Sequence, residues 1–215
     1  MKILKNKKRD LLLMFGGGIL LLFFYIFSFI VKSHALDSFD FNTTVRLQNH
    51  LPLRFDPFFS SLSLIGSFEV TATSLLVILL LRKKIFSVFT TFFFFLGAHV
   101  IEVFGKTFLH HPGPPHLFFR YNLYFNFPSS YVQPGSSYPS GHSLRILFLT
   151  VVIWFIISAS KKLSKNQKYI AIAAMGIFTF LMLISRVSLG EHWTTDVIGG
   201  SIFGAGVALF ALPFL

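Results

Sequence analysis

Residues 11–31 read LLLMFGGGILLLFFYIFSFIV, a run without a charged side chain that is long enough to cross a lipid bilayer as one helix. Further apolar stretches of similar length follow along the chain. Of the 215 residues, 53% are hydrophobic, 30 are Phe and only 13% are charged. A soluble domain of this size has too small an interior to bury so much apolar surface, so the composition indicates an integral membrane protein.

Six apolar stretches predict an all-α polytopic membrane protein with six transmembrane helices in a single bundle. The first stretch is longer than the apolar part of a signal peptide, so we expect it to be retained as an anchor. Residues 32–57 are expected to rest on the membrane surface. Without an internal repeat or linker, residues 1–215 are predicted to form one membrane-embedded domain. The expected spans cover approximately residues 11–31, 58–81, 85–104, 143–160, 169–184 and 193–215.

The net charge of +11 is concentrated in three basic clusters, at residues 2–9, 82–84 and 161–168. With six spans, all three clusters fall on one side of the membrane, and the positive-inside rule makes that side the cytoplasm. This predicts a plasma-membrane protein with both termini in the cytoplasm, and it explains the charge without nucleic-acid binding, which we do not expect. The absence of Cys excludes disulfides, thiolate metal sites and cysteine nucleophiles.

The segment 185–196, SRVSLGEHWTTD, carries the chemistry of a phosphate site. On a helix, His192 and Asp196 would share one face, since they are four residues apart. The carboxylate could then accept the Nδ1–H of the imidazole and leave Nε2 free as a nucleophile. Arg186 offers the planar fork of donors that suits phosphate. Ionisable residues at the membrane boundary are usually functional, so we interpret this segment as catalytic.

A second motif, Pro-Ser-Gly-His at residues 139–142, directly precedes the fourth apolar stretch. Ser140 or Gly141 can cap the helix that starts here, and the free N–H groups of a first helical turn bind anions. His142 can donate a proton to a leaving oxygen as a general acid. By the topology above, both motifs lie on the extracytoplasmic face of the membrane.

The long segment of about residues 105–141 is predicted to be an extracytoplasmic loop with a function, because long loops in compact proteins usually have one. Lys106 at its start can provide a point charge for phosphate. Glu102 precedes it by one helical turn and can hold it in place.

At this point the chain resembles the type 2 phosphatidic acid phosphatase family of membrane lipid phosphatases, which is related to the vanadium haloperoxidases. Two of the family's three motifs are intact, at residues 139–142 and 185–196. The resemblance implies that His192 attacks phosphorus and forms a phosphohistidine with Asp196 as its partner, while His142 protonates the leaving group. It also implies no metal and no other cofactor. The residues expected to hold the phosphoryl oxygens are Lys106, Ser140, Gly141 and Arg186.

The family's first motif, Lys-x6-Arg-Pro, is altered in this chain. From Lys106 the sequence reads KTFLHHPGP, so Gly113 stands where the motif has its arginine. Losing a phosphate-binding guanidinium would cost several kcal/mol of transition-state stabilisation unless another group replaced it. We expect Arg145, one turn after His142, to turn inward and supply that charge. The weaker alternatives are Arg120, His110 and His111.

The sequence therefore predicts a hydrolase that acts on lipid phosphates in the membrane without a metal. By family analogy the substrate ranked first is undecaprenyl diphosphate, followed by phosphatidic acid and phosphatidylglycerophosphate. One alternative is a phosphotransferase that passes the phosphoryl group from a lipid diphosphate to another alcohol. Another is a catalytically weak lipid-binding member of the family, which the change at Gly113 would favour.

Overall fold

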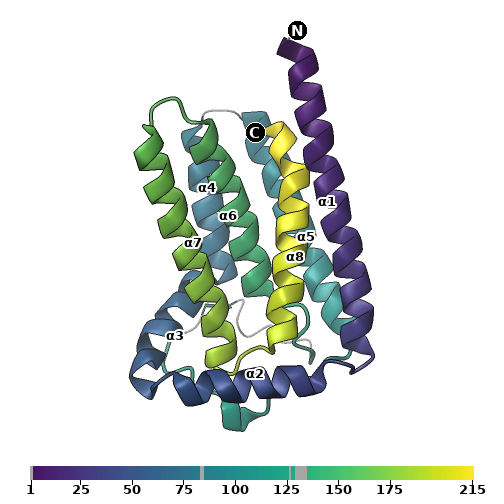
Figure 1. The fold of residues 1–215 in the computed structure, drawn as a ribbon, viewed down its shortest axis with the longest axis vertical. Helices are drawn as coiled ribbons and strands as arrows, with labels where there is room; N and C mark the ends of the chain where they lie inside the picture. The colour runs from purple at the N-terminus through teal and green to yellow at the C-terminus, as the bar shows by residue number, and fades with distance from the viewer. Residues whose placement is uncertain (1, 83–84, 126, 129–134) are drawn as a thin grey trace.

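The computed structural model describes residues 2–82, 85–125, 127–128 and 135–215, and all regular structure in these residues is helical (Figure 1). Lys83 and Lys84 of the second basic cluster, and part of the predicted extracytoplasmic loop, lie outside the described residues. The α-helices are α1 (Lys2–Lys32), α2 (Asp37–His50), α3 (Asp56–Ile65), α4 (Phe68–Leu81), α5 (Ile85–Phe108), α6 (Gly141–Ala159), α7 (Lys165–Ser188) and α8 (Thr194–Ala211). Short 3-10 helices are η1 (Leu53–Phe55), η2 (His116–Phe118) and η4 (Leu212–Phe214).

The long helices run side by side along the long axis of the molecule, and α2 crosses one end of the bundle (Figure 1). Both chain termini lie at the opposite end. Five helices in the described part of the chain are long and apolar enough to cross a membrane, or six when a bent pair is counted as one span. The five are Lys7–Lys32, Ile85–Phe108, Gly141–Ala159, Lys165–Ser188 and Thr194–Phe214. The all-α class expected from the sequence is thus confirmed.

The second expected span is not one straight helix. Leu53–Ile65 and Phe68–Leu81 meet at an angle of 55°. The break is local: Gly66 ends α3, and Ser67 begins α4 as its N-cap, with a side chain that accepts from the N–H of Val70. An apolar run of this length predicts a span, but it does not reveal a Gly-Ser break within the span.

The expected surface loop at residues 32–57 contains a regular helix, α2, which is far more polar than the other long helices. Asp40 is buried and anchors α2 to the start of α8. Its carboxylate accepts from Thr195 N at 2.8 Å and from Thr195 Oγ1 at 2.6 Å. The helix is therefore attached directly beside the second half of the segment 185–196.

Helix α8 occupies the middle of the bundle, where it packs most extensively against α6 and α1. Two glycines allow the close approach to α6. A Cβ added at Gly200 would lie 2.3 Å from the carbonyl oxygen of Ser140, and one at Gly204 would lie 2.1 Å from that of Leu144. Small residues let helix backbones meet in membranes, so this glycine face fixes α8 against the first turns of α6.

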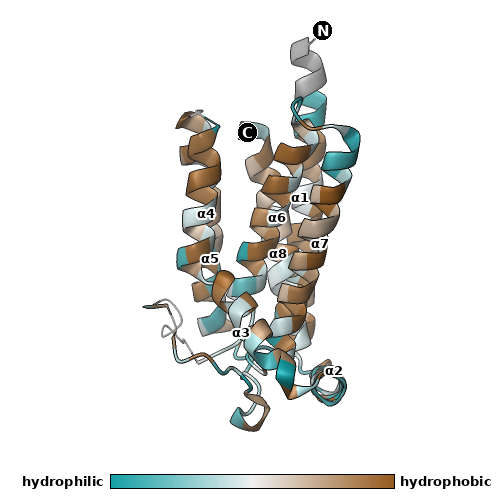
Figure 2. Cartoon of the chain, turned by 90° about the vertical axis from the view of Figure 1, so that its left-hand side faces the viewer, coloured by the Kyte–Doolittle hydropathy of each residue, from teal (hydrophilic) through white to brown (hydrophobic). Residues whose placement is uncertain are grey.

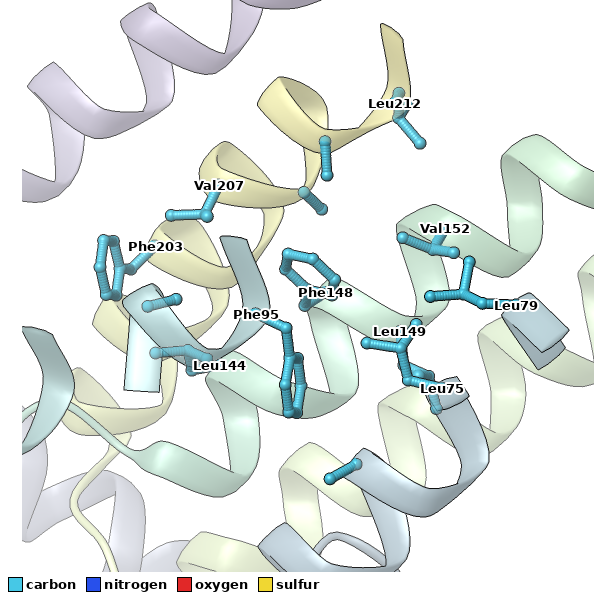
Figure 3. Close-up of a cluster of buried hydrophobic side chains, with 14 of the residues drawn as sticks. Leu75, Leu79, Phe95, Leu144, Phe148, Leu149, Val152, Phe203, Val207 and Leu212 are labelled. Atoms are coloured by element: carbon cyan, nitrogen blue, oxygen red, sulfur yellow. The ribbon is translucent and has the colours of Figure 1, made fainter. Parts of the chain in front are cut away.

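A buried apolar core holds α4, α5, α6 and α8 together (Figure 3). Phe95 of α5 contacts Phe148 of α6 edge to face, with ring centroids 5.3 Å apart. Leu75 of α4 and Phe203 of α8 complete the same cluster. The long helices are largely apolar along their length, as the brown colour in Figure 2 shows. Side chains such as Phe89 and Phe93 are more than two thirds exposed, which suits contact with lipid.

Candidate active site

A cavity of about 660 Å³ lies where the break between α3 and α4 meets the end of α5, the start of α6 and the end of α7. Its volume is within the usual range for small-molecule sites. Most of the expected site residues line it, although they are far apart in the sequence. They are Lys106, Gly141, His142, Arg145, Arg186 and His192. The structure therefore brings both histidines and the three expected cations to one cavity.

Ser140 and Asp196 do not line the cavity, and both are fully buried. Ser140 is the N-cap of α6, as predicted, and its hydroxyl accepts from Ser143 N at 3.4 Å. Its own N–H donates to the carbonyl oxygen of Asp196 at 3.0 Å. One backbone hydrogen bond thus joins the two motifs and positions His142 relative to His192.

The pairing of His192 with Asp196 differs from the sequence prediction. His192 lies in the turn before α8, so the two residues do not share a helix. The Nδ1 of His192 is 3.4 Å from Oδ2 of Asp196 and makes no hydrogen bond within the described residues. The carboxylate is already held by two other donors, Trp193 N to Oδ2 at 2.9 Å and His111 Nδ1 to Oδ1 at 2.9 Å.

The electrostatic setting of His192 suits a nucleophile. The side chain is 8% exposed, and burial lowers the pKa of His192 to about 4. The charges of Arg186 and Lys106 act in the same direction, while Asp196 opposes them. At neutral pH the imidazole is therefore uncharged and its free nitrogen carries a lone pair.

Arg186 extends from the end of α7 and contacts a carboxylate that the motif spacing did not single out. Its Nη1 contacts Oε2 of Glu191 and Oγ of Ser63, and the Ser63 hydroxyl also donates to Glu191 at 3.2 Å. Burial raises the pKa of Glu191 above its ordinary value, although Arg186 opposes the shift. Glu191 occupies one of the five variable positions between Arg186 and His192, which explains why the pattern alone could not identify it.

A second charged cluster lies on the α5 side of the cavity around Glu102. Lys106 Nζ is 2.6 Å from Oε1 of Glu102, so the expected support of Lys106 is present. His99 Nδ1 lies 2.7 Å from Oε2, and its ring stacks on Phe68. The sequence patterns do not point to His99, since a single histidine in an apolar helix carries no spacing signal.

Arg145 joins this cluster from α6. Its Nη1 is 3.9 Å from Oε2 of Glu102, and its Nε donates to the carbonyl oxygen of Gly66 at 3.3 Å. That carbonyl belongs to the break between α3 and α4. Arg145 is 5% exposed, so it turns into the cavity instead of extending to the membrane surface.

The other substitutes considered for the missing arginine lie elsewhere. Arg120 donates to the carbonyl oxygen of Leu51 at 3.2 Å and does not line the cavity. His110 is exposed, and His111 is bound to Asp196. Gly113 itself does line the cavity. Arg145 is therefore the substitute that the arrangement favours.

Among the described residues, no group of three or more His, Asp or Glu side chains could hold a metal ion. What the cavity offers is a set of cations and N–H donors around two imidazoles, an arrangement that suits an anion.

The family model described as the PAP2 superfamily matches residues 71–215, about two thirds of the chain. The chain belongs to the PAP2 superfamily. The resemblance seen in its motifs is thereby confirmed, and the matched region contains all three motif positions, including the altered one at Gly113.

Two curated relatives are similar over part of their length. Phosphatidylglycerophosphatase B of Bacillus subtilis (strain 168) is 43% identical over 81 residues, which cover 37% of this chain and 38% of the relative. A protein of Arabidopsis thaliana described as probable lipid phosphate phosphatase beta is 28% identical over 119 residues, or 46% of this chain and 56% of the relative. The matches thus span about half or less of each relative.

Two solved structures share the fold. A transmembrane PAP2-type phosphatidylglycerolphosphate phosphatase from Bacillus subtilis superposes with a TM-score of 0.71 over 93% of this chain and 94% of its own, at 22% identity. LpxE of Aquifex aeolicus gives a TM-score of 0.60 over 81% and 94%, at 21% identity. The helical arrangement described here is thus a PAP2 membrane-phosphatase fold.

Proposed function

We propose that this protein is an integral membrane phosphatase that removes phosphate from a lipid phosphate ester through a phosphohistidine intermediate. The observation that carries the proposal is that two imidazoles, His142 and His192, line one cavity with the three cations Lys106, Arg145 and Arg186. A protein that only binds lipid phosphate has no need for an uncharged buried imidazole beside a carboxylate.

In the first step, the cations and the free N–H groups at the start of α6 hold the phosphoryl oxygens. The Nε2 of His192 attacks phosphorus while the bond from phosphorus to the lipid oxygen breaks. The leaving oxygen takes a proton from His142, and the lipid alcohol departs. Asp196 stabilises the positive charge that develops on His192.

In the second step, water attacks phosphorus and the phosphorus–nitrogen bond breaks. His142 now takes a proton from the water, which returns it to its starting state. Inorganic phosphate leaves, and His192 is again uncharged. The three cations stabilise the charge of the transferring group in both steps, the task that metal ions have in other phosphoryl-transfer enzymes.

For the substrate we place phosphatidylglycerophosphate first, because the similar proteins of Bacillus subtilis are phosphatases of that lipid. Undecaprenyl diphosphate, which family analogy ranked first, is the second substrate to test, and phosphatidic acid is the third. All three present a terminal phosphate on a membrane lipid, which is the chemistry that the cavity can recognise.

We further propose six spans, with the bent pair α3–α4 as one of them, both termini in the cytoplasm and the cavity on the extracytoplasmic side. The basic loop between α6 and α7 supports this orientation. Since the chain has no Cys, one introduced thiol is a unique reporter. In intact cells a membrane-impermeant maleimide should label His110→Cys and leave Lys161→Cys unlabelled. The reverse pattern would reject the orientation.

The activity test is phosphate release by the purified protein in detergent, with EDTA present and each of the three lipids supplied in turn. We expect release by the wild type and none by His192→Ala. The control His110→Asn changes an exposed histidine that does not line the cavity, and it should match the wild type. Labelled phosphate should be trapped on the wild-type protein and not on His192→Ala. Equal release by wild type and His192→Ala would reject the mechanism.

Product analysis separates the alternatives. Transfer of labelled phosphate to a lipid alcohol instead of water would identify a phosphotransferase. Lipid binding without any release would identify a binding protein.

A further inference from the structure

His111 is a buried histidine outside the motifs, and it lies between two carboxylates. Its Nδ1 is 2.9 Å from Oδ1 of Asp196, and its Nε2 is 3.9 Å from Oδ2 of Asp40. The residue is 4% exposed and does not line the cavity. It therefore lies outside the cavity lining, but it contacts the carboxylate that faces His192.

The backbone around His111 is held firmly. Its N–H donates to Ser136 Oγ at 3.0 Å, and its carbonyl oxygen accepts from Ser137 N at 2.9 Å and from Ser137 Oγ at 3.0 Å. The next carbonyl, that of Pro112, accepts from the indole N–H of Trp193 at 2.8 Å. The backbone at His111 is thus held both by the loop and by the segment before α8.

These contacts determine how the Asp196 carboxylate is oriented. His111 holds Oδ1 and the Trp193 N–H holds Oδ2, so the group cannot rotate freely. In this orientation Oδ2 faces Nδ1 of His192 at 3.4 Å. Without His111, Oδ1 would lose the one donor that the described residues give it, and the carboxylate would be free to rotate away from His192.

The same imidazole connects the site to helix α2. Asp40, which lies beyond His111, is bound to Thr195 through both of its oxygens. Polar groups no more than 3.9 Å apart therefore connect α2 through His111 and Asp196 to His192.

We propose that His111 is a positioning residue for the phosphatase reaction, one that fixes the Asp196 carboxylate so that it orients His192. The inference rests on the proposed function. A role limited to stabilising the loop would use the backbone contacts of His111 and would not require a hydrogen-bond donor aimed at Asp196.

The charge of His111 adds a pH-dependent element. Burial lowers the pKa of His111, but the hydrogen bond and charge of Asp196 and the charges of Asp40 and Asp37 outweigh burial, so the pKa is raised. Among the described residues, the titratable Tyr138 also faces the ring, which it meets edge to face at 6.2 Å. A donor on Asp196 reduces the negative field at His192. Removing that donor should therefore favour the protonated form of His192.

The test compares His111→Leu with His111→Asn in the full-length protein. Leu and Asn have nearly the same shape, but only Asn keeps an N–H donor at the place of Nδ1. We expect His111→Leu to lower kcat about tenfold or more, the usual effect of removing a hydrogen-bond partner that orients a functional group. KM should change little. The acid limb of its kcat/KM profile should move to higher pH. His111→Asn should recover most of kcat. His110→Asn is the neighbouring control, since Asn tolerates the positive φ of 37° at that position.

A measurement independent of turnover is the NMR titration of His192 in protein with labelled histidines. In His111→Leu its midpoint should lie at higher pH than in the wild type. If the wild type releases no phosphate, the proposed function fails while this titration still tests the contact.

Equal kcat and equal midpoints in His111→Leu and wild type would overturn the inference. So would equal impairment of the Leu and Asn variants at unchanged thermal stability. If the Leu variant does not fold, full activity and an unshifted midpoint in an alanine variant would overturn it.

Discussion

Arg145 on α6 places Nη1 3.9 Å from Oε2 of Glu102 on α5, inside the cavity that also exposes Gly113. Gly113, which stands where the first motif has its arginine, and the buried Arg145 therefore line the same cavity. A guanidinium is too costly to bury without partners, and here Glu102 and the Gly66 carbonyl provide them. The charge is thus available inside the cavity.

If Arg145 replaces the missing arginine, Arg145→Ala should lower kcat/KM about 100-fold, the usual effect of losing one donor to the transition state. Arg120→Ala is the matched control, because that arginine binds the carbonyl oxygen of Leu51 outside the cavity. Rates are compared at equal amounts of folded protein in detergent. Full activity of Arg145→Ala would show that its charge serves the fold alone.

Restoring the motif tests the same idea in the opposite direction. A Cβ added at Gly113 would lie 3.5 Å from Cβ of Ser137, an ordinary contact, so Gly113→Arg should fold normally. In the Arg145→Ala background this change should recover a large part of the lost kcat/KM, because a guanidinium returns to the cavity. The double variant is assayed beside both single variants. If a well-folded double variant recovers no activity, Arg145 does not take the role of the arginine that the motif has at position 113.

The contact between α8 and α6 should control both stability and activity. Gly200→Ala places a Cβ 2.3 Å from the carbonyl oxygen of Ser140, so the backbones must separate. We expect a loss of about 1–3 kcal/mol, typical of overpacking, and lower turnover, because this contact sets His142 against His192. The control is Gly176→Ala, which has open space around it and should stabilise its helix by roughly 0.5–1 kcal/mol. Thermal unfolding in detergent and phosphate release measure the two effects. Equal behaviour of the two variants would contradict the prediction.

His192 should titrate near pH 4 instead of near 6.5, because burial disfavours its charged form. At pH values above about 4, the folded protein therefore keeps the imidazole of His192 uncharged, with a lone pair available to attack phosphorus. An NMR titration of labelled histidines, with His192→Ala to assign the signal, gives the midpoint. Added inorganic phosphate should move that midpoint upward, because a bound anion stabilises the charged imidazole. A midpoint at or above 6.5 without phosphate would show that the site is more hydrated than the structure indicates.

The sequence alone predicted the class of protein, the approximate spans and the two intact motifs. The physical reason is that exclusion from water in a bilayer requires long apolar helices, and those are visible as composition. It also predicted the support of Lys106 by Glu102, since residues one turn apart on a helix are neighbours in any fold.

The tertiary structure decided which distant groups meet. The break at Gly66 freed the carbonyl that receives Arg145, and the packing of α8 on α6 brought His142 and His192 to one cavity. The partner of Asp196 could not be read from spacing either. His111 reaches that carboxylate from a loop some eighty residues away in the chain, and only the folding of the loop onto the start of α8 determines such a contact.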